Sequence, residues 1–185
     1  METHSEEKTV RRINRNRGES AFLQDGKTQE GHSRENGRLY AKADTFVIGR
    51  DGPVLEAWGG ACRVIAMYEN AGKNGAVIHI NAVDLWGNRH EELIDQLLEA
   101  VPDLSKSALP YVLGDTSSLD PYVQELEGDR ESWNKAIAEY LKKKGIKNVK
   151  VFSSGEGKDV SLDTQTGILK VLDDNGKPLL EVKMS

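Results

Sequence analysis

The chain has 185 residues, of which 37% are hydrophobic and 30% are charged, a composition that fits a single soluble domain with a polar end. Its formal net charge of −5 argues against nucleic acid as the main partner, because phosphate binding needs a cationic surface. No apolar run approaches the length that spans a bilayer, so we expect no membrane insertion.

The N-terminal residues and the number of cysteines indicate in which cellular compartment the protein is expected. The first twenty residues, METHSEEKTVRRINRNRGES, lack the apolar centre of a secretory signal. The single cysteine, Cys62, excludes an internal disulfide framework and a cysteine-based zinc site. We therefore expect a cytoplasmic protein by default, with secretion as a leaderless effector left open.

The polar N-terminal segment differs in composition from the rest of the chain. Residues 1–42 are rich in Glu, Arg, Asn, Gly, Ser and Gln, and their only apolar cluster is Ala21-Phe22-Leu23. Neither strand nor helix periodicity is evident in them. The sequence therefore predicts a flexible polar arm over residues 1–42 and a folded domain over residues 43–185.

The folded part opens with short apolar runs separated by turn sequences. The turns are Arg50-Asp51-Gly52-Pro53, Gly59-Gly60-Ala61 and the polar hairpin at 69–75. Short apolar runs separated by turn sequences are typical of strands that pair with their neighbours in the chain. The predicted strands cover residues 45–48, 54–58, 64–68 and 76–80.

Two amphipathic helices and further strands follow. The first helix runs from Asn88, with Asn88 as N-cap and Glu91 completing a capping box, to Val101. The second runs from about 129 to 144 and ends at three lysines and Gly145, a typical helix end. Further strands are predicted at 108–113, 149–152, 160–163, 168–172 and 179–182. Strands outnumber helices and mostly form hairpins, which predicts an α+β fold.

One group of residues in the sequence suggests a catalytic mechanism. Cys62 directly follows the turn Gly59-Gly60-Ala61, and His79 lies 17 residues later on the second strand of the hairpin. An imidazole can take the thiol proton and activate the sulfur, and the turn amides of Gly59, Gly60 and Ala61 can face an oxyanion. The alternative is structural, because cysteine usually behaves as a small buried hydrophobe. No metal cluster or cofactor fingerprint accompanies these residues.

These residues resemble the chemoreceptor glutamine deamidases, the CheD family. The residues that carry the resemblance are Gly59, Cys62, the run Ala66-Met67-Tyr68-Glu69, Gly75 and His79, followed by blocks at 109–114, 134–146 and 160–167. The likeness spans roughly Asp44 to Leu172. It implies a layered α/β/β/α sandwich of mixed sheets and hydrolysis of a protein glutamine to glutamate through a thioester on Cys62. It also implies no cofactor and a partner protein that carries the target glutamine.

The same cysteine–histidine core is shared by deamidating toxins of the cytotoxic necrotizing factor type. The setting is therefore left open between chemotaxis and a bacterial effector. The chain departs from the CheD pattern at two places. Its turn reads Gly-Gly-Ala-Cys rather than Leu-Gly-Ser-Cys, and Glu56 stands six residues before the cysteine, where the family has threonine.

These departures leave the third catalytic member open. Glu56 is one candidate for orienting His79, and Asp115, Thr116 or a backbone carbonyl are others. Trp58 either lines the mouth of the site and contacts substrate or belongs to the core. The departures also favour an alternative function, that of a catalytically inactive CheD-like module that binds a partner protein.

Overall fold

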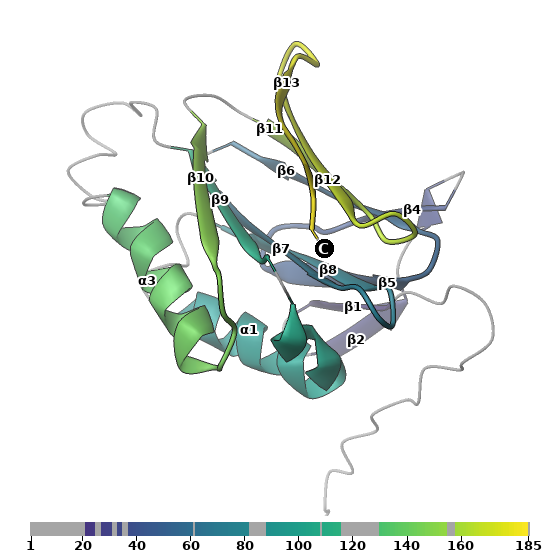
Figure 1. Ribbon diagram of the computed structural model, residues 1–185, viewed down its shortest axis with the longest axis vertical. Coiled ribbons are helices and arrows are strands. Elements are labelled where there is room, and N and C mark those ends of the chain that lie inside the picture. Colours follow the sequence, from purple (N-terminus) through teal and green to yellow (C-terminus); the bar gives the residue numbers. More distant parts are fainter. Residues whose placement is uncertain are drawn as a thin grey trace, which may run out of the picture.

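The protein folds into two stacked mixed β-sheets with few helices (Figure 1). The computed structural model describes residues 21–24, 27–30, 33–34, 37–60, 62–81, 88–107, 109–115, 130–154 and 158–184. All statements about structure below refer to these residues.

The first sheet has seven strands in the order β10-β9-β7-β8-β5-β1-β2. Its strands are β1 Ala21–Gln24, β2 Lys27–Glu30, β5 Thr45–Arg50, β7 Arg63–Glu69, β8 Asn74–Ile80, β9 Tyr111–Asp115 and β10 Lys150–Ser154. Neighbouring strands are antiparallel except β9 and β10, which are parallel. A parallel pair needs a crossover connection, and the helix α3 lies between these two strands in the chain.

The second sheet has six strands in the order β13-β12-β11-β6-β4-β3. Its strands are β3 Ser33–Arg34, β4 Arg38–Tyr40, β6 Val54–Gly59, β11 Lys158–Asp163, β12 Ile168–Asp173 and β13 Pro178–Lys183. Only β4 and β6 are parallel. The two sheets are linked by tight connections, because β6 of the second sheet leads directly through the glycine turn into β7 of the first.

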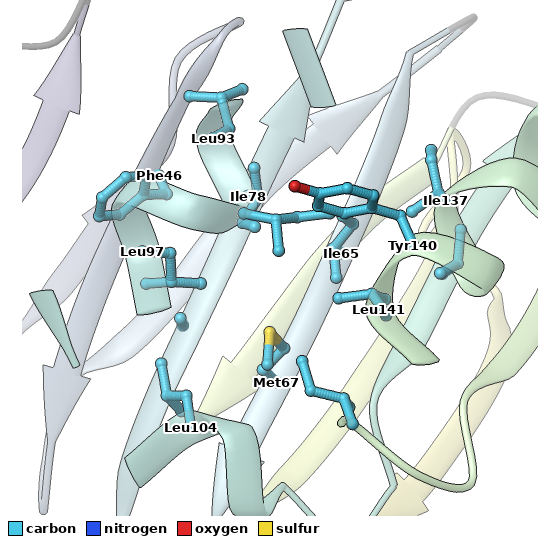
Figure 2. Packing of buried hydrophobic residues seen from close by; sticks show 14 of the residues in the cluster. Phe46, Ile65, Met67, Ile78, Leu93, Leu97, Leu104, Ile137, Tyr140 and Leu141 are labelled. Atoms are coloured by element: carbon cyan, nitrogen blue, oxygen red, sulfur yellow. The ribbon is translucent and has the colours of Figure 1, made fainter. Parts of the chain in front are cut away.

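Helices cover one face of the seven-stranded sheet (Figure 1). They are α1 Arg89–Ala100, α3 Arg130–Lys143 and a 3-10 helix, Pro102–Lys106. The core beneath them, here called the helix-side core, is filled by apolar side chains, most of them large (Figure 2): Phe46, Ile48, Ile65, Met67, Ala76, Ile78, Ile80, Leu93, Ile94, Leu97, Leu104, Val112, Ile137, Ala138, Tyr140, Leu141 and Ile146. Each fully buried Val, Leu, Ile, Phe or Met side chain contributes about 1.5–3 kcal/mol of transfer free energy.

A second core lies between the two sheets and is called the inter-sheet core. Its buried members come from both sheets: Leu39, Ala41, Val47, Leu55, Ala57, Val64, Ala66, Tyr68, Val77, Leu113, Val160, Leu162, Leu169, Val171 and Met184. Successive strand residues point to opposite faces, so β7 supplies Val64 and Ala66 to this core and Ile65 and Met67 to the other. Central strands buried on both faces read as continuous apolar runs, as β7 and β8 do.

The predicted α+β class is compatible with this arrangement, whereas the predicted layer order is only partly found. Both helices lie on the seven-stranded sheet, and no helix among the described residues covers the outer face of the six-stranded sheet. That outer face presents exposed residues such as Trp58, Asp159 and Lys170. The described architecture is therefore α/β/β, with one helical layer. The outer face of the six-stranded sheet carries mostly polar side chains, which do not need a covering layer.

The predicted domain boundary at residue 43 comes too late. The strand β4 pairs with β6, and Leu39 and Ala41 are buried in the inter-sheet core. The strands β1 and β2 also fall within the predicted arm, and β1 pairs with β5. Polar residues between these short strands mask the pattern in the sequence, and residues 1–20 lie outside the described part.

Most other elements match their predictions. The hairpin of β7 and β8, the strands β5 and β6, and the helix α3 ending at Gly145 (φ 87°) are confirmed. The capping box at Asn88 is wrong, because Asn88 adopts a left-handed conformation (φ 57°) and its side chain makes no capping hydrogen bond. Neither described helix is long and apolar enough to cross a bilayer.

Candidate active site

The register of β7 and β8 brings Cys62 and His79 to the same end of the inter-sheet core. Val64 pairs directly with His79, and Arg63 pairs with Ile80. Cys62 lies in the bend that immediately precedes β7, two residues before Val64. Cys62 is half-buried there.

The ring of His79 is held in one orientation by the main chain. Its Nδ1 lies 3.1 Å from the carbonyl oxygen of Ala41. A carbonyl can only accept a hydrogen bond, so Nδ1 carries the proton, and the Nε2 of the neutral ring has its lone pair available. This Nε2 is buried and makes no hydrogen bond to any described group.

Burial favours the neutral form of this histidine. Only 5% of His79 is exposed, and desolvation lowers its pKa below the ordinary value of 6.5, while the hydrogen bond to Ala41 acts in the opposite direction. A neutral imidazole with Nδ1 protonated is the form that can accept a proton at Nε2. His79 therefore meets the requirements of a general base.

The acceptor on Nδ1 is itself fixed by the second sheet. Ala41 is fully buried and follows β4, and its N–H donates to the carbonyl oxygen of Glu56 at 2.8 Å. The position of the His79 ring thus depends on the pairing of β4 with β6. Of the considered orienting groups that the structure describes, a backbone carbonyl is the one that contacts His79.

The structure does not bring the carboxylate of Glu56 to His79. Leu55 and Ala57 are buried in the inter-sheet core, so the alternation of β6 turns Glu56 to the opposite face. There its carboxylate accepts a hydrogen bond from Arg38 Nη1 at 2.6 Å. The predicted orienting role of Glu56 is therefore wrong, although its main chain supports Ala41.

Trp58 lies on the surface beside the glycine turn. Its side chain is 47% exposed, which excludes the core role considered for it. A Cβ atom built on Gly60 would lie 2.9 Å from the Trp58 ring, so the indole covers the turn residue two positions before Cys62. Gly59 closes β6 and is buried, whereas Ala61 lies outside the described residues.

Two other predicted alternatives fall outside what the structure describes. Asp115 ends β9, but its side chain is not described, and Thr116 lies in an undescribed segment. Among the described residues, no group of three or more His, Cys, Asp or Glu side chains is placed to hold a metal ion.

Sequence reasoning missed two features of the site. The carbonyl of Ala41 belongs to the main chain and leaves no signal in residue identities. The second is Lys158, which falls between the strands predicted at 149–152 and 160–163 but is fully buried at the start of β11. Its alternation with Val160 and Leu162 was the available signal, because all three share one face of the strand.

Comparison with known proteins adds no family context. No protein-family model matches the chain, and no curated protein matches it either. The function has to be argued from the residues and their geometry.

Proposed function

We propose that the protein is a cysteine-dependent protein-glutamine deamidase, with Cys62 as nucleophile and His79 as general base. The observation that carries the proposal is the state of His79. Its Nδ1 is committed to the Ala41 carbonyl, and its buried Nε2 has no described partner, at the end of the sheet where Cys62 immediately precedes β7.

The first half of the reaction forms a thioester. Nε2 of His79 takes the thiol proton of Cys62, and the sulfur attacks the carboxamide carbon of a glutamine side chain. When the tetrahedral intermediate collapses, the carbon–nitrogen bond breaks, and the imidazolium gives its proton to the departing nitrogen, which leaves as ammonia. The glutamine carbonyl carbon is then bonded to sulfur.

The second half restores the enzyme. Neutral His79 takes a proton from water, and the resulting hydroxide attacks the thioester carbon. The carbon–sulfur bond breaks, Cys62 recovers its proton from the imidazolium, and glutamate is left in the substrate. The oxyanion in both halves needs backbone donors, a role that we assign to the amides of the turn Gly60-Ala61-Cys62.

The choice of glutamine as substrate rests on the resemblance to the CheD family. A cysteine–histidine pair alone also suits other acyl transfers. The ordered set of matching segments, from the glycine turn through His79 to the strand, turn and strand at 160–167, supports a deamidase. The indole of Trp58 beside the turn offers a flat apolar surface to the peptide that carries the glutamine.

The test compares wild type with Cys62→Ser. Each is incubated with a bacterial lysate and, separately, with a eukaryotic lysate, and glutamine-to-glutamate conversion is mapped by peptide mass spectrometry. We expect conversion at specific sites with wild type and none with Cys62→Ser. Conversion in the bacterial lysate alone supports a chemotaxis-type role, and conversion in the eukaryotic lysate alone supports an effector.

A second measurement separates an enzyme from an inactive binding module. The rate of Cys62 alkylation is followed against pH in wild type, His79→Ala and the matched variant His90→Ala. An ordinary thiol titration near pH ~8.5, unchanged by His79→Ala, together with equal lysate profiles for wild type and Cys62→Ser, would overturn the deamidase proposal.

A further inference from the structure

The chain is acidic as a whole, with a formal net charge of −5, yet one stretch of it is strongly basic. The end of α3 and the start of β10 contain five lysines: Lys142, Lys143, Lys144, Lys147 and Lys150. No Asp or Glu occurs from residue 140 to residue 155. Charge that is separated in this way creates a local positive potential, which attracts acidic partners.

Three of these lysines are called the basic patch: Lys142, Lys147 and Lys150. All three are exposed, and none forms an ion pair with a described residue. Lys144, by contrast, pairs with Asp95 on α1 at 2.6 Å. The charges of the basic patch are therefore available to a partner.

The basic patch lies beside a strand that has no neighbour on its outer side. β10 is the outermost strand on one side of the seven-stranded sheet, next to α3 (Figure 1). The N–H of Lys150 donates to the carbonyl oxygen of Pro110 at 2.8 Å, so the main-chain groups of Lys150 face β9. Main-chain groups of successive strand residues point alternately to the two sides. Those of Val151 and Ser153 therefore point away from β9.

This outer edge of β10 is open among the described residues. The outward N–H and C=O groups of Val151 and Ser153 make no hydrogen bond to any described residue. Val151 is also 48% exposed. A row of unpaired main-chain groups of this kind is a template for a further strand.

The other outermost strands differ from β10 in length or in charge. β3 has two residues, and β2 carries both Lys27 and Glu30. β13 carries both Glu181 and Lys183, and its Glu181 pairs with Lys170 at 3.2 Å. Of the described edges, β10 alone combines an open ladder with neighbouring charges of a single sign.

These charges decide which occupant fits the edge. A second copy of the chain, paired through its own β10, would place lysines against lysines, and like charges repel. Nucleic acid or an anionic membrane would meet the lysines but leave the outward N–H and C=O groups of the strand unused. An extended peptide that carries Asp or Glu satisfies both the lysines and the ladder.

We propose that the outer edge of β10 binds an extended acidic segment of a partner protein, which adds to the sheet as a further strand. Main-chain hydrogen bonds to Val151 and Ser153 hold the segment, and its carboxylates face the basic patch. This docking surface does not depend on the proposed role of Cys62.

The experiment uses a short fluorescein-labelled peptide in which Glu and Val alternate, titrated with the full chain and followed by fluorescence anisotropy. We expect saturable binding that weakens as salt is added, because salt screens exposed charges. A peptide with Lys in place of Glu should not bind. A peptide with Pro in place of Val keeps the charge but loses N–H donors, and it should bind about tenfold more weakly.

The ladder is tested by proline substitution at an outward position. Val151→Pro removes one outward N–H and leaves the hydrogen bonds to β9 in place, and it should weaken peptide binding about tenfold. Val151→Ala keeps the N–H and should bind like wild type. Circular dichroism and thermal melting establish that the variants are folded, and Ser153→Pro replaces Val151→Pro if the latter is not.

The basic patch is tested by charge reversal. Lys147→Glu combined with Lys150→Glu should weaken binding about tenfold, since each lysine changes from attracting to repelling the peptide. The matched control combines Lys177→Glu with Lys183→Glu, which changes the net charge equally at two exposed residues of the other sheet. This control should bind within about twofold of wild type.

Amide hydrogen exchange distinguishes strand addition from simple attraction between charges. The peptide should protect the N–H groups of Val151 and Ser153, because both become hydrogen-bonded. The proposal is overturned by any of four results: no saturable binding up to about 1 mM peptide, equal binding of the Val and Pro peptides, equal binding by the two charge-reversed proteins, or no protection at Val151 and Ser153. Tighter binding of single-stranded DNA or phosphatidylserine vesicles than of the peptide would also reject it.

Discussion

Two buried histidines lie on opposite sides of the seven-stranded sheet, and their surroundings differ in the one respect that matters for chemistry. His79 in the inter-sheet core is oriented by the Ala41 carbonyl and lies beside the start of β7. His90 on α1 packs edge-on against the ring of Tyr140, with centroids 6.2 Å apart, and its Nδ1 is buried without a described hydrogen bond.

Burial is therefore not what distinguishes them. His90 is 6% exposed and His79 is 5% exposed, and desolvation lowers the pKa of both below 6.5. Of the two, only His79 has its tautomer fixed by a described hydrogen bond, and only His79 lies at the end of the sheet where Cys62 precedes β7. The difference teaches that a buried histidine is a candidate base only when one nitrogen is committed and the other faces a reacting group.

The sharpest test of this comparison is the loss of each histidine in turn. His79→Gln should lower the rate of glutamine conversion by about 10²–10⁴-fold, the usual contribution of a general base, whereas His90→Gln should stay close to wild type. Rates are measured by ammonia release and peptide mass spectrometry on the substrate that the lysate experiment identifies. Equal losses in the two variants would mean that the effect is structural.

A smaller effect should appear in the pH dependence of stability, and here the two histidines should act alike. Each binds a proton in the unfolded chain near pH 6.5, whereas the folded protein, with its lowered pKa, resists protonation. The stabilisation that comes from the two neutral histidines is therefore fully present above pH 6.5. Below pH 6.5 the free energy of unfolding falls as the pH drops toward the folded pKa, by at most about 1.4 kcal/mol per pH unit for each histidine.

Urea unfolding between pH 5 and pH 8 measures this dependence. Replacing either His79 or His90 with Gln should flatten the loss below pH 6.5, and replacing both should flatten it further. A wild-type protein whose stability rises as the pH falls from 6.5 would contradict the expectation for both histidines.

Trp58 extends the comparison to the protein surface, where we expect an effect on substrate binding alone. Trp58→Ala should change the free energy of unfolding by no more than about 0.5 kcal/mol, as is usual for exposed positions, and should raise KM for the protein substrate. The matched control is Val151→Ala, since Val151 on β10 is 48% exposed. A KM unchanged by Trp58→Ala would remove Trp58 from the proposed substrate contact.

The smallest effect is expected at Glu56. Glu56→Gln weakens a surface pair with Arg38, worth about 0–1 kcal/mol, and leaves the Ala41 carbonyl in place. The alkylation profile of Cys62 should therefore match that of wild type. A displaced profile would return Glu56 to the role that the sequence suggested for it.

The hairpin that carries the site could be predicted from the sequence because its signals are local. Apolar runs on either side of the polar turn at 69–75 specify β7 and β8, and once they pair in antiparallel fashion His79 comes back beside Cys62. The strand alternation also predicts which side chains share a face. These are statements about near neighbours in the chain.

The parts that could not be predicted depend on contacts between distant segments. The parallel pairing of β4 with β6 and of β9 with β10 has no local signature, and Ala41 enters the site through the first of these pairs. Likewise, the predicted strand at 160–163 begins two residues too late, because Lys158 is polar and yet starts β11 as a buried residue. A polar residue at a strand end is ambiguous until its neighbours on the other strands are known.

The acceptor that orients the His79 ring is a main-chain oxygen, and this affects how the site can be studied by mutation and truncation. No side-chain substitution can delete the acceptor at Ala41, so a conventional alanine scan of the site would never find it. A shortened protein that starts at residue 43, where the composition changes, would keep both Cys62 and His79 and still lack the group that holds the ring. Deletion series, rather than point mutations, are the means of locating this part of the machinery.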